Sequence, residues 1–219
     1  MGKMGSESSA RVNPLLKLVH CELTLALDSD PAVHLTLTPQ LTCTIPMSVI
    51  LLMMTIGLDM ESNAWRSIND GVMGGLSSGG IVQIDEGLRF TGELSLENNG
   101  GFSSARRLVE QDLSGATGVR LEVRGDGREY QFRIRQNNRF DGVAWRAMFS
   151  TNTEWQVVEI ALDEFIPVFR GRVVSEAGPV IPSEIQQIGF LISDKNAGRF
   201  ELDIRRIEFL GTQPDSTHE

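Results

Sequence analysis

The chain has 219 residues, 41% of them hydrophobic and 22% charged, which is the balance of one soluble globular domain with or without an appendage. The net charge of −9 and the pI near 4.9 argue against a nucleic-acid-binding surface and against docking on anionic lipid. All cysteines and histidines lie near the ends, so the middle of the chain lacks the usual zinc ligands, the commonest nucleophile and the commonest neutral-pH base: Cys21, Cys43, His20, His34 and His218.

Residues 1–45 differ in composition from the rest, being rich in Thr, Leu and Ser without a helical period. The favoured interpretation is a poorly ordered extension, or translated upstream sequence ahead of a true start at Met47 or Met60. The alternative is a β-hairpin added to the domain. Because no cysteine follows Cys43, the remaining chain needs no disulfide and suits a reducing compartment.

The longest apolar run, residues 47–58, is shorter than the roughly 20 residues of a membrane-spanning helix. It has no cationic residue close before it and no small-residue cleavage site after it, so it does not resemble a signal peptide. We predict a buried first strand here and no transmembrane segment.

The domain predicted for residues 46–211 consists of short strands separated by turns. The predicted strands are residues 50–58, 80–84, 88–96, 102–107, 119–124, 130–136, 143–149, 155–161, 187–193 and 199–210. Residues 162–168 are predicted as a loop, 183–186 as one helical turn and 212–219 as a disordered tail. The pattern has no long amphipathic helix and predicts an all-β fold, a jelly-roll β-sandwich in preference to a simple barrel.

The chain is organised around residues 65–77, W-R-S-I-N-D-G-V-M-G-G-L-S. Its Asn-Asp-Gly and Gly-Gly pairs predict tight turns, with Trp65 and Met73 packed beneath them. We interpret the motif as structural, and a backbone nest for an anion is the less favoured alternative. The motif residues are Asn69, Asp70, Gly71, Gly74 and Gly75.

In this order, six stretches of the chain resemble the complex I intermediate-associated protein 30 family. They are W-R-S-I-N-D-G-V-M-G-G-L-S at 65–77, F-T-G-E-L-S-L-E-N-N-G-G-F-S-S-A-R at 90–106, G-D-G-R-E-Y-Q-F-R-I-R at 125–135, W-Q-V-V-E-I-A-L-D-E-F-I-P-V-F-R-G-R at 155–172, I-G-F-L-I-S-D-K at 188–195 and G-R-F-E-L-D-I at 198–204. The resemblance implies a galactose-binding-like β-sandwich. It also implies a non-enzymatic, chaperone-like assembly factor that binds a protein client, such as subunits of a membrane redox complex.

The family has no established catalytic residues, so the resemblance supplies no active site, and we predict neither a cofactor nor an enzyme. Residues 1–45 contain acidic groups and do not resemble a cationic mitochondrial presequence, which favours a cytoplasmic protein. A carbohydrate-binding module is the alternative function, and a glycosidase that uses carboxylates alone ranks last.

Two stretches are candidate binding sites. Arg120, Arg124, Arg133 and Arg135 are predicted to line one face of two neighbouring strands joined by a hairpin at 125–127, with Trp145 or Phe149 as a stacking platform. The favoured alternative is a solvated face whose charges pair with one another.

The second candidate is residues 165–172, where aromatic side chains and arginines surround a proline, as at many interface centres. The alternative is a loop that closes the sandwich with both phenylalanines in the core. The candidate residues are Phe165, Phe169, Arg170 and Arg172.

Several turns also contain an aspartate, and converging turn aspartates can bind structural calcium. Local hydrogen bonding is the commoner use of such residues and is the one we favour, so we predict no metal. The aspartates are Asp70, Asp112, Asp126, Asp141 and Asp194.

Overall fold

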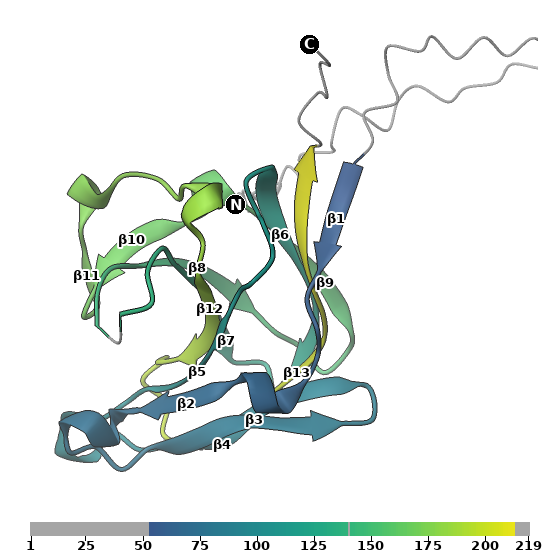
Figure 1. Cartoon of the computed structure of the whole chain (residues 1–219). Helices are drawn as coiled ribbons and strands as arrows, with labels where there is room; N and C mark the ends of the chain where they lie inside the picture. Colours follow the sequence, from purple (N-terminus) through teal and green to yellow (C-terminus); the bar gives the residue numbers. More distant parts are fainter. Residues whose placement is uncertain (1–52, 140, 213–219) are drawn as a thin grey trace, which may run out of the picture. The chain divides into compact units, whose positions relative to one another are not determined.

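The computed structural model describes residues 53–139 and 141–212, and within them it is all-β (Figure 1). The strands are β1 (Met53–Gly57), β2 (Arg66–Asn69), β3 (Ser78–Ile84), β4 (Gly87–Leu94), β5 (Ser103–Leu108), β6 (Ala116–Gly125), β7 (Glu129–Arg135), β8 (Ala144–Ser150), β9 (Gln156–Ala161), β10 (Ile166–Phe169), β11 (Arg172–Val173), β12 (Gln187–Ile192) and β13 (Gly198–Thr212). Short 3-10 turns connect several of them. The predictions for residues 1–45 and 213–219 lie outside the described residues, whereas Thr212, predicted to begin the tail, still belongs to β13.

The strands form two antiparallel sheets. The six-stranded sheet has the order β3-β4-β13-β6-β9, and β1 also pairs with β13. The seven-stranded sheet has the order β11-β10-β8-β7-β12-β5-β2. The long strand β13 pairs with β6 along one edge, while β4 and β1 share the other edge in succession. This arrangement is the predicted jelly-roll sandwich.

The core lies between the sheets because each strand alternates apolar and polar residues. On β7, Tyr130, Phe132 and Ile134 are fully buried, and β12 is buried along its whole length because it is an interior strand of its sheet. Phe132 and Phe190 meet edge to face with ring centroids 5.3 Å apart. Burying one such large apolar side chain stabilises the fold by about 1.5–3 kcal/mol.

Three short strands, β10, β11 and β2, were missed. Residues 162–168 were predicted as a loop because of Pro167, but β10 lies there and pairs with β8. Its neighbour β11 has only two residues, so this is the edge of the sheet, where a proline is tolerated. The third is β2, which pairs with β5 but has only four residues, three of them polar or charged, and so carries little alternation signal.

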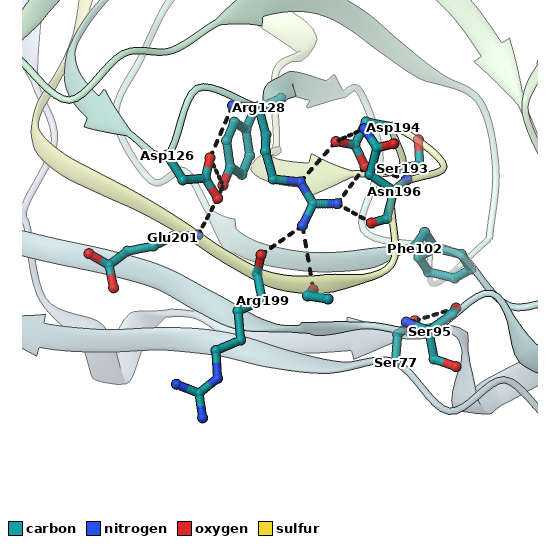
Figure 2. A network of polar contacts seen from close by, with 12 residues as sticks. Ser77, Ser95, Phe102, Asp126, Arg128, Ser193, Asp194, Asn196, Arg199 and Glu201 are labelled. Carbon is teal, nitrogen blue, oxygen red and sulfur yellow. Dashed lines mark hydrogen bonds and ion pairs between the residues drawn. The ribbon is translucent and has the colours of Figure 1, made fainter.

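The predicted hairpin at 125–127 is wrong. β6 belongs to the six-stranded sheet and β7 to the seven-stranded sheet, so this segment carries the chain from one layer to the other. A buried ion pair holds the corner: Arg128 donates to both carboxylate oxygens of Asp194 at 2.8 and 2.6 Å and to the carbonyl oxygen of Arg199 at 2.8 Å (Figure 2). Burial opposes ionisation of Asp194, but the hydrogen bonds from Arg128 and Asn196 outweigh it and lower its pKa.

Among the described residues, no helix is long and apolar enough to cross a membrane.

Candidate functional site

Four arginines stand in one register row on the outer face of the seven-stranded sheet. Arg66 on β2 is opposite Arg106 on β5, and Arg133 on β7 is opposite Arg146 on β8. Gly189 on β12 is opposite both Arg106 and Arg133 and therefore occupies the middle of the row. With neighbouring strands about 4.8 Å apart, the row crosses the sheet over about 19 Å.

The row faces away from the core because of strand alternation. The residues next to its members in sequence, including Ala105, Phe132 and Phe190, belong to the buried core. Arg135 follows Arg133 by two residues and therefore lies on the same outer face. We call Arg66, Arg106, Arg133, Arg135 and Arg146 together the arginine face.

Nearby polar groups hold the arginine side chains in position. Arg133 donates two hydrogen bonds to Oε1 of Gln131, at 3.0 and 2.7 Å, and Gln131 in turn donates to Oγ of Ser193 at 3.0 Å. Arg135 donates to the carbonyl oxygen of Gly142 at 3.1 Å, so the loop between β7 and β8 folds over it. Among the described residues, Nε of Arg146 is buried without a hydrogen-bond partner.

The positive charges of this face repel one another. Burial, followed by repulsion from Arg135, lowers the pKa of Arg106 to about 10, with Asp141 acting against the shift. Burial and the charges of Arg135, Arg106 and Arg146 lower the pKa of Arg133 to about 10. With pKa values of about 10, Arg106 and Arg133 remain protonated at neutral pH, so the folded chain keeps these like charges partly buried and close together.

Carboxylates are scarce around the arginine face. Asp141 is the one that acts on Arg106 and Arg135, and it is itself bound to Arg170 at 2.6 Å. Within the part of the chain that the structure describes, four of the five arginines form no ion pair with a carboxylate: Arg66, Arg133, Arg135 and Arg146.

A hollow of about 620 Å³ adjoins the arginine face at its β2 end. Arg66 and Arg106 line it from the sheet, and Arg139 lines it from the loop after β7. Asp59 and Glu61 line it from the segment before β2, so the hollow carries both signs of charge.

The structure separates the four arginines that were predicted to share a face. Arg133 and Arg135 are on the arginine face, whereas Arg120 and Arg124 are on β6, in the other sheet. There Arg120 pairs with Glu159 at 2.8 Å and Arg124 with Asp203 at 2.8 Å. The alternation was read correctly, but it does not tell which sheet a strand joins.

The predicted stacking platform is also wrong. Trp145 and Phe149 are 6% and 5% exposed and point into the core, and Nε1 of Trp145 donates to the carbonyl oxygen of Gly178 at 2.9 Å. It is Arg146, between them in sequence, that faces outward.

Residues 165–172 divide between core and surface. Phe165 is buried and meets Phe132 edge to face at 6.3 Å, so it is not a surface contact. Phe169 is 36% exposed, which also excludes the alternative that places both phenylalanines in the core. Arg170 lies over the Phe169 ring at 5.2 Å and, with Gly171, forms the turn to β11, where Arg172 is exposed.

The glycine-rich loop is built around Asp70, which is fully buried at the start of the 3-10 turn η3 (Asp70–Met73). Its carboxylate accepts hydrogen bonds from the Ser77 hydroxyl at 2.5 Å and from the backbone N–H groups of Ser77, Gly101 and Phe102 at 2.9, 2.7 and 3.3 Å. Burial raises its pKa, but these hydrogen bonds together outweigh burial and lower it.

The glycines around Asp70 make this approach possible. A Cβ on Gly75 or Gly100 would lie 2.4 or 2.6 Å from atoms of the Asp70 carboxyl group, and Gly74 has a φ of +90°. Since Asp70 binds the N–H of Ser77, and the N–H groups of Gly74 and Gly75 donate to carbonyl oxygens within the loop, the nest for an external anion is wrong. Gly71 accepts the N–H of Gly74 at 3.2 Å and closes the first turn.

Asn69 connects the two layers beside this loop. Its Nδ2 donates to the carbonyl oxygen of Gly79 on β3, and its Oδ1 accepts from Ser103 on β5 at 2.7 Å. Trp65 packs on Phe190 at 5.7 Å, but Met73 is 66% exposed, so the prediction that it lies beneath the turns is wrong.

The turn aspartates do not converge. Asp126 accepts the Tyr130 hydroxyl at 3.1 Å, Asp112 accepts the N–H of Ser114, and Asp141 and Asp194 bind arginines. Across residues 53–139 and 141–212, no three or more of the His, Cys, Asp and Glu residues form a group that could hold a metal ion.

Sequence reasoning missed Arg66, Arg106 and Arg146. Each is separated from Arg133 by many residues, and only strand pairing aligns them. The signal available was local: Arg146 alternates with Trp145 and Ala147, and Arg106 with Ala105, so each arginine had the parity of an outward residue.

This architecture defines a class by its fold, the antiparallel jelly-roll β-sandwich. The chain is similar to the family 11 carbohydrate-binding module from Clostridium thermocellum in complex with a mixed-linked tetrasaccharide, with a TM-score of 0.56 and 20% identity over 72% of this chain and 96% of that chain. A second structure of a family 11 module, from the cellulosomal cellulase Lic26A-Cel5E, gives a TM-score of 0.54 and 18% identity over 76% and 98% of the chains. At these identities the likeness concerns the fold alone.

Comparison of the sequence with known families identifies the family of this chain. The model of complex I intermediate-associated protein 30 matches residues 55–204, so the chain belongs to that family, as its motifs predicted. The mitochondrial complex I intermediate-associated protein 30 of Mus musculus is 35% identical over 117 residues, 51% of this chain and 35% of that protein. The Drosophila melanogaster protein is 24% identical over 139 residues, 60% of this chain and 46% of that protein. The chain therefore spans less than half the length of these relatives.

Proposed function

We propose that this chain is a non-catalytic assembly factor that binds a protein client during biogenesis of a respiratory or other membrane redox complex. The observation that carries the proposal is the family match over residues 55–204. The relatives are named complex I intermediate-associated proteins, and subunits of such a complex are the clients that we propose for this chain.

The arginine face supports binding as the activity. Arginine is enriched at the centres of protein interfaces because its guanidinium is planar and forms several directed hydrogen bonds. The turn between β10 and β11 would extend the contact, since β10 is the neighbour of β8 and presents Phe169, Arg170 and Arg172 at the sheet edge. The proposal needs no cofactor and no catalytic group.

The alternative, binding of a carbohydrate, has lost the observation that suggested it. Sugar rings stack on exposed aromatic faces, and the proposed platform residues Trp145 and Phe149 are buried. The likeness to carbohydrate-binding modules concerns the fold, so it does not by itself favour a sugar ligand.

The compartment remains part of the proposal. We predict a cytoplasmic chain, whereas the relatives have "mitochondrial" in their names. Cell fractionation followed by detection of the native protein distinguishes the two locations.

Affinity purification of the tagged full chain from native membranes, followed by mass spectrometry, tests the function. We expect identified subunits of one membrane redox complex to co-purify, and deletion of the chain to lower the amount of that complex on a native gel. Normal assembly after deletion, with no such subunit recovered, would contradict the proposal. A variant of the exposed residue Glu154, Glu154→Gln, serves as the matched control and should recover the same subunits.

A further inference from the structure

We propose that the arginine face binds an acidic, extended segment of the protein client, with client carboxylates placed between the guanidinium groups of Arg106 and Arg133. This inference rests on the proposed function, because it specifies the chemistry by which that client is recognised.

Charge complementarity is the first argument. Burial and, after it, the neighbouring arginine charges lower the pKa of Arg106 and of Arg133 to about 10, and among the described residues Arg133 and Arg135 form no ion pair with a carboxylate. A carboxylate brought by a partner would reduce this repulsion and gain charge-assisted hydrogen bonds. The face therefore has an electrostatic reason to accept an anion.

The second argument is the gap at Gly189. This glycine lies between Arg106 and Arg133 in the row, and a Cβ there would come within 2.6 Å of the Ala105 carbonyl oxygen and 3.2 Å of the Arg106 side chain. Gly189 therefore contributes no side chain to the two-strand interval of about 10 Å between the two arginines, and the Arg106 side chain borders that interval. That interval is where a client carboxylate can contact both guanidinium groups.

The third argument is the type of cation. Every positive side chain of the face is arginine, and Lys195 is the only lysine after residue 45. The guanidinium fork matches a carboxylate in a bidentate geometry that an ammonium group cannot provide.

The size of the row favours a short peptide over a nucleic acid. The row is about 19 Å long, which about six residues of an extended chain can cross. A long polyanion would continue past it and meet Asp59 and Glu61 in the adjoining hollow, on a chain of net charge −9. A flexible acidic peptide can place about six residues on the row and turn its other residues away from the hollow.

Titration of a fluorescent decaglutamate peptide with the full chain, followed by anisotropy, tests the inference. We expect saturable binding that weakens at least about tenfold when the salt concentration rises from about 50 mM to about 500 mM. The double variant Arg106→Gln/Arg133→Gln should bind at least about tenfold more weakly than the unmodified chain.

The matched control is Arg120→Gln/Arg124→Gln, which removes the same two charges from the six-stranded sheet and should change the affinity less than about twofold. A second double variant, Arg66→Gln/Arg146→Gln, tests the ends of the row and should also bind more weakly. Circular dichroism establishes whether each variant is folded. If Arg106→Gln/Arg133→Gln does not fold, Arg66→Gln/Arg146→Gln provides the test.

Absence of decaglutamate binding would overturn the inference, as would equal loss in the control. Preferential binding of an oligouridylate, or peptide-independent association of the chain with itself through the same arginines, would also overturn it. If clients co-purify from membranes but decaglutamate does not bind, the inference fails and the proposed function stands. If decaglutamate binds and no client is recovered, the proposed function fails.

Discussion

Both sheets carry arginines on their outer faces, but those of the six-stranded sheet form ion pairs with carboxylates, whereas among the described residues four of the five arginines of the arginine face form none. There Asp203, 2% exposed, binds Arg89 at 2.6 Å and Arg124 at 2.8 Å, and Glu122 binds Arg205 at 2.8 Å. Hydrogen bonds to these carboxylates raise the pKa of Arg89 and of Arg205. On the seven-stranded sheet, burial and mutual repulsion instead lower the pKa of Arg133.

An aromatic side chain reinforces the contrast. The ring of Trp155 lies 4.7 Å from the Arg124 guanidinium and 4.0 Å from that of Arg205, so it adds cation–π attraction to the carboxylate pairs of the six-stranded sheet. The same residue type thus stabilises one face of the sandwich and costs stability on the other. This difference supports the proposal that the arginine face serves to bind a client.

Loss of Asp203 should have the largest effect on this contrast. Asp203→Asn leaves Arg89 and Arg124 without their shared carboxylate, and we expect the free energy of unfolding to fall by about 2–3 kcal/mol. The effect should be smaller than for a fully buried pair, because both guanidinium groups are partly exposed and solvent screens them. Urea denaturation followed by fluorescence measures the change.

The control is Glu159→Gln, which removes an exposed partner of Arg120 and should cost less than about 1 kcal/mol. We call the outer face of the six-stranded sheet, where arginines pair with carboxylates, the paired face. Equal effects of the two substitutions would show that Asp203 is not the centre of the paired face.

Acid should weaken the paired face selectively. Burial opposes ionisation of Asp203, but hydrogen bonds from Arg89 and Arg124 lower its pKa below the ordinary value of 3.8. A lowered carboxyl pKa contributes stability that is complete above the unfolded value and is lost as the pH falls through the folded value. The free energy of unfolding should therefore be steady above about pH 5 and decline below about pH 4.

Measuring the free energy of unfolding of Asp203→Asn over the same pH range isolates the contribution of the Asp203 carboxyl group. Its stability should depend less steeply on acid pH, although Asp70 and Asp194 also have lowered pKa values and leave a residual slope. A slope equal to that of the unmodified chain would contradict the assignment.

On the arginine face, removal of a positive charge should raise the free energy of unfolding, whereas loss of Asp203 lowers it. Arg146→Met keeps the length of the side chain, removes one like charge and removes a buried Nε that has no partner among the described residues. We expect the free energy of unfolding to rise by about 1 kcal/mol. The matched substitution Arg124→Met on the paired face should lower it by a similar amount, and destabilisation by both would remove the proposed difference between the faces.

The sequence supported the fold more fully than the site. Alternation within β7 placed Arg133 and Arg135 outward, and the apolar run of β12 indicated an interior strand. Parity along a strand identifies the outward residues, but it does not tell which sheet the strand belongs to or which distant residues stand beside it. For that reason Arg120 was grouped with the wrong partners, and Arg106 was not recognised.

The platform residues show a different limit. Trp145 shares its parity with Ala147 and Phe149, while Arg146 and Met148 have the other, so the sequence already indicated that the tryptophan points inward. The glycine loop was recognised as turns, but its cause, a buried carboxylate binding backbone donors from a second loop, depends on the contact of Asp70 with Gly101, which is far away in sequence.

Gln131→Glu tests most directly whether the like charges that lower the stability of the arginine face are also the charges that bind an acidic peptide. The new carboxylate would take over the hydrogen bonds from Arg133 and accept one from Ser193, which gives this face the pairing of the other sheet. In the decaglutamate titration we expect affinity to fall at least about fivefold while the free energy of unfolding rises by about 0.5–1 kcal/mol. Unchanged affinity in a variant of equal or greater stability would contradict the account.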